Sequence, residues 1–165
     1  MIKIILYVTL MLFLAPVWAG NTMTINIMGQ VMAAPSCSIV GNNAGRIEVN
    51  FGDSLQTHLI NGASYKTAIP FSLSCSGNPT NLRLKFTGGA STFDPNVLGT
   101  NIPNFGVQLL KPNSSALALD EWFTFAYSGT PPTLWAVPVK KSNVLGSELA
   151  VGEFGASTTL LLEVL

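Results

Sequence analysis

The sequence predicts an all-β protein built as an antiparallel sandwich, and three observations lead to that prediction. Short runs alternate apolar and polar residues, turn-forming residues separate the runs, and no stretch has helical periodicity beyond a possible turn over residues 116–119. Alternation of this kind is the pattern of strands that bury one face. Strands at this spacing, punctuated by Gly, Pro and Asn, are typical of sandwiches.

The first 19 residues form a candidate secretory signal peptide. Lys3 supplies a positive charge, a mostly apolar run covers residues 4–14, and Val17 and Ala19 are small residues at the cleavage positions. A transmembrane anchor, the alternative, needs about 20 apolar residues, and polar residues begin too soon. We therefore expect export, with residues 1–19 removed and one domain of ordinary size remaining.

Composition argues against several classes of partner. Charged residues make up 10% of the chain, 8 basic and 8 acidic, and no basic cluster supports binding to nucleic acid or to an anionic membrane.

Cys37 and Cys75 are the two cysteines, and an exported chain is expected to join them in one disulfide. A metal site, the alternative, lacks ligands because His58 is the only histidine. No cofactor is expected.

A strand is predicted for residues 21–32, directly after the leader. Its polar positions are filled mainly by Thr, Asn and Gln, and Pro35 separates it from the rest of the chain. Its other face consists of Met23, Ile25, Ile27, Gly29 and Val31. Gly29 has two possible interpretations that strand chemistry alone does not separate. It marks either a bulge or bend, or an inward position with little room for a side chain.

Seven further strands are predicted in the body of the chain, each with apolar residues at alternate positions. Turn residues such as Gly88-Gly89 and Asp94-Pro95-Asn96 separate them. The runs cover residues 47–51, 69–75, 82–86, 105–109, 123–127, 135–139 and 154–164.

The last predicted strand has an unusual position, because the chain stops at Leu165 with no returning strand. An immunoglobulin-like sandwich would place one more strand beside it. Without that strand we expect an open sheet edge and an apolar groove. The face that would line the groove consists of Phe154, Ala156, Thr158, Leu160, Leu162 and Val164.

Candidate catalytic groups are few, and we predict no enzymatic activity. Asp53, Ser54 and His58 lie close in sequence, but no nucleophile elbow of the G-x-S-x-G type is present, so His58 is interpreted as a loop residue. Asp120-Glu121 is interpreted as a solvated turn rather than a catalytic pair. Trp122 and Trp135 could form a sugar platform, although core or sheet-face positions are more common for such residues.

The chain after the leader resembles, over its whole length, the subunits of chaperone–usher pili. The single short domain is most similar to the minor tip or adaptor subunits of type 1 and P-like pili, although rod and adaptor subunits are not distinguished. The resemblance rests on the leader, T-I-N-I-M-G-Q-V ahead of Cys37, F-S-L-S-C at 71–75, N-V-L-G-T-N-I-P-N-F-G-V-Q-L-L at 96–110 and G-E-F-G-A-S-T-T-L-L-L at 152–162.

The resemblance implies an N-terminal donor-strand extension, residues 20–35, and an incomplete immunoglobulin-like pilin domain, residues 36–165, that lacks its last (G) strand. A periplasmic chaperone is expected to lend a strand to the groove until, at the outer-membrane usher, the extension of the next subunit replaces it. The donor residues would be those of the 23–31 face, with Gly29 opposite a shallow pocket, and the apolar face of the last strand would line the acceptor groove. The carboxylate of Leu165 would anchor the chaperone, although Val164 stands where related subunits commonly have tyrosine.

Two functions are therefore expected to compete. The first is a structural minor or adaptor subunit, exported through the periplasm to a surface fimbrium, which assembles with neighbouring subunits and supports cell adhesion. The second is a secreted monomeric β-sandwich that binds a ligand such as a carbohydrate. The first predicts a protease-sensitive N-terminal tail and a chain that is unstable or polymerises alone, and the second predicts a closed monomer.

Overall fold

The computed structural model describes residue 20 and residues 23–165, so the predicted signal peptide lies outside the described residues. The chain divides into two units, Met1–Met32 and Ala33–Leu165. Every helix and strand of the described part belongs to the second unit, which we call the domain. None of the described helices is long and apolar enough to cross a membrane.

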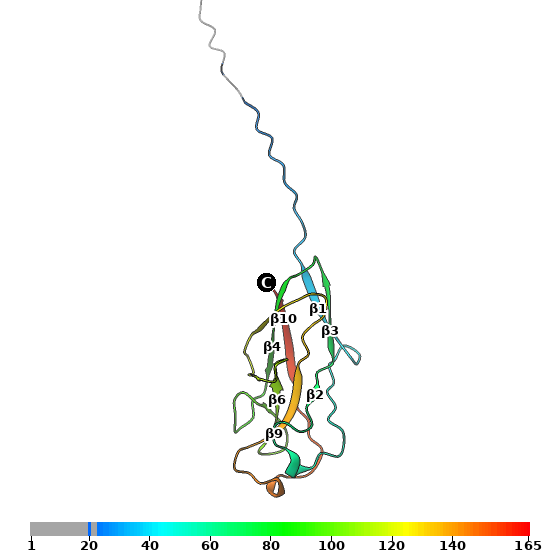
Figure 1. Ribbon diagram of the computed structural model, residues 1–165, viewed down its shortest axis with the longest axis vertical. Coiled ribbons are helices and arrows are strands. Elements are labelled where there is room, and N and C mark those ends of the chain that lie inside the picture. Colours follow the sequence, from blue (N-terminus) through cyan, green and yellow to red (C-terminus); the bar gives the residue numbers. More distant parts are fainter. Residues whose placement is uncertain (1–19, 21–22) are drawn as a thin grey trace, which may run out of the picture. The chain divides into compact units, whose positions relative to one another are not determined.

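Three antiparallel sheets form the domain (Figure 1). The first pairs β1 (Ser36–Gly41) with β3 (Phe71–Ser76). The second has the order β10–β4–β8, formed by Thr158–Val164, Asn81–Gly88 and Phe123–Ala126. The third has the order β2–β9–β6–β5, formed by Thr67–Ala68, Trp135–Lys140, Phe105–Leu110 and Leu98–Gly99, and β7 (Ala116–Leu117) also pairs with β6.

The core is made of side chains from the two larger sheets. On β4 the alternate residues Leu82, Leu84 and Phe86 are buried, whereas the residues between them are not. They belong to one apolar cluster with Val107 and Leu109 of β6. A single cluster supplied by both sheets is the arrangement of a sandwich, so the predicted fold class is confirmed.

Most predicted strands are confirmed, and four predictions need correction. Strands β3, β4, β6, β8 and β9 lie where the alternation placed them. The run 47–51 is not a strand, the run 154–164 becomes a strand only from Thr158, and the described residues of 21–32 form no strand. The possible turn at 116–119 begins instead with the short strand β7.

Strand β1 was not predicted because its alternation is weak. Its inward positions include Cys37 and Ile39, whereas Val40 is exposed. After β1 the chain makes a small loop in which the backbones of Asn43 and Arg46 exchange hydrogen bonds of 3.1 and 2.7 Å. Only glycine fits at Gly41, because a Cβ there would collide with the carbonyl of Arg46.

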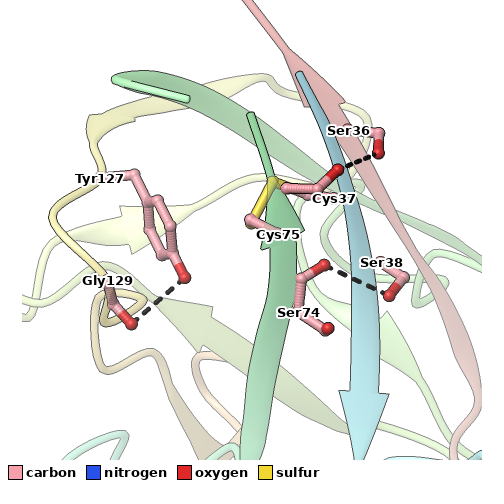
Figure 2. Close-up of a disulfide and its surroundings, with 8 residues drawn as sticks. Ser36, Cys37, Ser38, Ser74, Cys75, Tyr127 and Gly129 are labelled. Carbon is pink, nitrogen blue, oxygen red and sulfur yellow. Dashed lines mark hydrogen bonds between the residues drawn. A yellow bond between two sulfur atoms is a disulfide. The ribbon is translucent and has the colours of Figure 1, made fainter. Parts of the chain in front are cut away.

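A disulfide between Cys37 and Cys75 joins β1 to β3 at directly opposed positions (Figure 2), as the cysteine count predicted. The neighbouring hydroxyls of Ser36 and Ser76 lie 2.9 Å apart and form a hydrogen bond across the same pair of strands. Because β3 is the one hydrogen-bonded neighbour of β1 among the described strands, the covalent link is its firmest attachment to the domain.

Replacing both cysteines with alanine is expected to lower the free energy of unfolding by roughly 3–4 kcal/mol, because the bond closes a loop with a sequence separation of 38. Chemical denaturation followed by tryptophan fluorescence measures the change. Ser38→Ala, an exposed change on the same strand, is the control and should shift stability by less than about 0.5 kcal/mol. Equal midpoints for the double variant and the native chain would contradict this prediction.

Candidate functional site

A groove of about 1680 Å³ reaches into the sandwich between two segments of the chain that are far apart in sequence. One edge is formed by residues 45–53 and the other by residues 149–160. The floor consists of apolar core residues from β4, β5, β6 and β9 together with Ile69: Phe86, Leu98, Phe105, Val107, Leu109 and Ala136. The groove thus gives direct access to the hydrophobic core.

Strand β10 forms part of one edge of the groove and has a free side. It pairs with β4 in a register that runs from Thr158–Gly88 to Val164–Leu82. Within residues 23–165, no strand pairs with its opposite side. The backbone N–H and C=O groups on that side therefore lack a ladder partner, which makes β10 a template for another strand.

The facing edge keeps the alternation of a strand without being one. Ile47, Val49 and Phe51 are half-buried, and Glu48 and Asn50 between them are exposed. In the part of the chain that the structure describes, this segment has no neighbour in a hydrogen-bonded ladder, which is why the strand predicted for residues 47–51 is absent. An added strand beside it would supply that neighbour.

The lower part of the β10 edge, residues 154–157, is held by side chains instead of a ladder. Asn101 Nδ2 donates to the carbonyl of Glu153 at 3.1 Å, and the N–H of Gly155 donates to Asn101 Oδ1 at 2.8 Å. The ring of Phe154 packs edge-on against Phe105, with 4.7 Å between centroids, and its centroid lies 6.0 Å from that of Phe51. Phe154 therefore connects the core to both edges of the groove.

The predicted groove residues fall into two groups. Phe154, Ala156, Thr158 and Leu160 line the groove. Leu162 and Val164 share the inward face of β10 but pack against the core, and β10 contacts β1, which lies beside it in Figure 2. On this edge the groove lining therefore covers residues 149–160 and stops at Leu160, and β1 adds Ile39 and Gly41 to the lining.

The residues predicted to form a donor strand are all exposed in this structure. The exposed fractions are 89% for Met23, 77% for Ile25, 90% for Ile27 and 100% for Val31. Gly29 is exposed as well. Four large apolar side chains on one face of a strand pattern are thus unburied.

The structure adds residues that sequence reasoning did not assign to the site. These are the floor residues, the facing edge 45–53 and the Asn101 clamp. The alternation of Ile47, Val49 and Phe51 could have identified the facing edge. A groove left by a missing strand has a strand pattern on each side, and this segment supplies the second one. No sequence signal pointed to Asn101.

The other candidate residues form no site. Asp53, Ser54 and His58 are exposed, and the described residues contain no group of three or more His, Cys, Asp and Glu that could hold a metal ion. Arg83 Cζ lies 4.5 Å and Lys85 Nζ 4.7 Å from the centroid of the Trp122 ring, and Lys66 Nζ lies 4.5 Å from that of Trp135. A cation thus lies over the indole ring of each of these two residues, where a sugar would stack.

The Asp120-Glu121 doublet forms a solvated turn, as predicted. Both residues are exposed, and Asp120 accepts a hydrogen bond from Thr87 Oγ1 at 2.8 Å. Lys111 Nζ donates to Glu121 Oε1 at 2.9 Å, and this hydrogen bond holds the pKa of Glu121 below its usual value. Asp120 and Glu121 are thus held in local contacts with Thr87 and Lys111.

An unpaired edge strand above an open apolar groove defines an immunoglobulin-like sandwich that lacks one strand, which is the architecture of pilus subunits. The chain belongs to the fimbrial protein family, whose model matches residues 25–164. It is therefore a pilus subunit, a component of a surface fimbrium that interacts with other pilus subunits.

Relatives and solved structures agree with this assignment. The chain is 35% identical to the fimbrial-like protein YfcR of Escherichia coli strain K12, over 81% of this chain and 75% of that one. It is 36% identical to the fimbrial adapter PapF of Escherichia coli, over 66% of this chain and 62% of that one. The solved structure of the P pilus adaptor subunit PapF aligns with 78% of this chain and 94% of its own, at 26% identity and a TM-score of 0.55.

Phe154→Ala is expected to lower the free energy of unfolding by about 2–4 kcal/mol, because the ring loses its contacts with Phe105 and Phe51 and leaves a cavity at the groove. Equilibrium denaturation measures the loss. Leu161→Ala, on the exposed face of the same strand, is the matched control and should cost less than about 1 kcal/mol. Equal costs for the two variants would show that Phe154 does not support the groove.

Proposed function

We propose that this protein is a structural, non-catalytic subunit of a chaperone–usher pilus that assembles by strand donation. Its groove receives the N-terminal extension of one neighbouring subunit, and its own residues 23–31 fill the groove of another. The observation that carries the proposal is the free side of β10 above an apolar groove. Three segments with strand patterns, 23–31, 47–51 and 154–157, all lack a hydrogen-bonded neighbour, and one donated strand per subunit would satisfy all three.

The dimensions of the extension match those of the groove. Residues 23–31 in extended form span about 30 Å, and the edge formed by residues 149–160 covers a similar length of chain. A period-two strand laid between the edges places Met23, Ile25, Ile27 and Val31 over an apolar floor, with Thr24, Asn26 and Gln30 toward solvent. Gly29 would face a place in the groove with little room for a side chain.

The magnitudes favour a long-lived joint. Burying the four large donor side chains contributes on the order of 6–12 kcal/mol, at roughly 1.5–3 kcal/mol each. Each net hydrogen bond of the new ladder adds about 0.5–1.5 kcal/mol. Ordering a free extension opposes these gains, so they are upper bounds.

A chaperone and an usher are part of the proposal. An apolar groove open to water needs a temporary occupant before assembly, and we propose a periplasmic chaperone that anchors the carboxylate of Leu165 and is exchanged at an outer-membrane usher. Leu165 is accessible for this, with 57% of its surface exposed. The likeness to the P pilus adaptor subunit PapF supports a minor or adaptor position that serves cell adhesion.

The alternation of the extension provides a sharp test. Ile27→Asp is expected to prevent this subunit from entering the groove of its neighbour, because a carboxylate would be buried without a partner. Asn26→Asp, one position away on the outward face, should be incorporated normally. The measurement is the amount of the subunit in pili purified from cells that assemble them.

Equal incorporation of the two variants would contradict donation by residues 23–31. Failure of both variants would also count against it, because period-two burial requires the neighbouring position to tolerate the charge.

A further inference from the structure

Three apolar side chains are exposed at one end of the domain, where the groove ends. Leu59 is 41% exposed, Leu145 is 65% exposed and Val151 is 87% exposed. Leu59 ends η2 (Thr57–Leu59), Leu145 directly precedes η3 (Gly146–Glu148), and Val151 lines the groove. Figure 1 shows these two short helices, one teal and one orange, at the end of the domain opposite the C-terminus. We call these three residues the end patch.

The end patch rests on a tightly packed base. The two short helices contact each other, and Gly146 lies so close to His58 that a Cβ would be 2.7 Å from the His58 Cα. Ile60 and Leu149, each next to this contact in sequence, are buried in a small apolar cluster with Phe105. Leu59 and Leu145 are therefore presented to solvent by a closely packed support.

The groove lining reaches the end patch on one side and stops at Leu160 of β10 and Ile39 of β1 on the other. β1 contacts β10, and the groove lining on β10 stops at Leu160. At the end-patch side, Leu55, Thr57 and Ala150 line the groove as well. Because β1 packs beside β10 where the lining stops, we take a strand in the groove to join its own folded domain on the end-patch side.

The length of the tether sets how far away that folded domain can lie. In this chain, residues 32–35 alone separate Val31 from the first strand at Ser36. The five Cα–Cα steps from Val31 to Ser36 reach at most about 18 Å. A donor with the same organisation must therefore place its folded domain against the end of the groove, where the exposed apolar residues are.

We propose that the end patch is a second contact surface, which packs against the folded domain of the subunit whose strand fills the groove. The inference rests on the proposed function, since it requires a donated strand. Burial of Leu59, Leu145 and Val151 by the donor's domain adds apolar contact to the joint without any further strand pairing. It also makes the joint stiffer, because a strand alone would leave the two domains free to swing about the tether.

Site-specific photo-crosslinking in assembled pili tests the contact. A benzophenone amino acid replaces Leu145 in the full chain, and cross-linked peptides are identified by mass spectrometry. The same group at Ala156, inside the groove, reports the donated strand, and at Thr124, an exposed residue of β8, it serves as the negative control. The expected result is a cross-link from Leu145 to the folded domain of the same subunit whose extension cross-links to Ala156.

The outcomes separate this inference from the proposed function. A cross-link from Ala156 to a neighbour's extension, with none from Leu145 to that neighbour's domain, overturns the end patch and leaves strand donation in place. A cross-link from Leu145 to the subunit that receives this chain's own extension overturns the patch as well. No cross-link from Ala156 to any extension overturns strand donation, and the inference with it.

A matched substitution pair provides a second readout. Leu59→Ser is expected to speed release of the neighbour from isolated pili in denaturant by about tenfold, the effect of losing roughly one buried leucine contact. Leu161→Ser removes a leucine that is also 41% exposed, on a different face of the domain, and should leave the rate within about twofold. Equal rates for the two variants would overturn the patch.

Discussion

The structure depends on one unmet requirement, the hydrogen bonding of the free side of β10. This strand is paired with β4 on one side only, and the same gap leaves the apolar floor of the sandwich open. A sheet edge of this kind is normally covered or blunted. Here neither occurs along residues 154–160 of the described chain, so this edge and the groove beside it stay open.

Other features of the domain keep the gap open at a defined place. The disulfide from Cys37 to Cys75 holds β1 against β3, and β1 covers the far end of β10. The Asn101 side chain holds the opposite end of that edge. The groove lies between these two attachments and is lined by residues 149–160 along this edge.

The sequence predicted the longer strands β3, β4, β6, β8 and β9, but it missed β1 and the two-residue strands β2, β5 and β7. On β4 and β6 the alternation and the ladder coincide, because both neighbours lie in the same chain. In 47–51 the alternation is equally clear, yet no ladder forms, because the pattern reports which face is buried and not whether a partner strand exists. The weakly alternating β1 was missed for the opposite reason, since its position depends on pairing with β3 and on the disulfide.

The candidate site was also predicted only in part from the sequence. The face of the last strand was predicted as one unit, and four of its six residues line the groove, whereas Leu162 and Val164 pack against the core in the part closed by β1. The floor could not be predicted, because Phe86, Leu98 and Ala136 come together only through long-range packing of both sheets. The clamp by Asn101 depends on loop geometry that no local pattern encodes.

The most direct measurement of the central claim is the thermal unfolding of two variants. One contains residues 36–165, and the other contains the same residues with residues 21–32 linked after Leu165. If the groove is an incomplete part of the fold, the linked chain should be a monomer that melts roughly 20 °C or more above the other, the shift that corresponds to several kcal/mol in a domain of this size. If residues 36–165 already form a stable monomer and the added strand changes its melting temperature by less than about 2 °C, the groove is not the site of a missing strand.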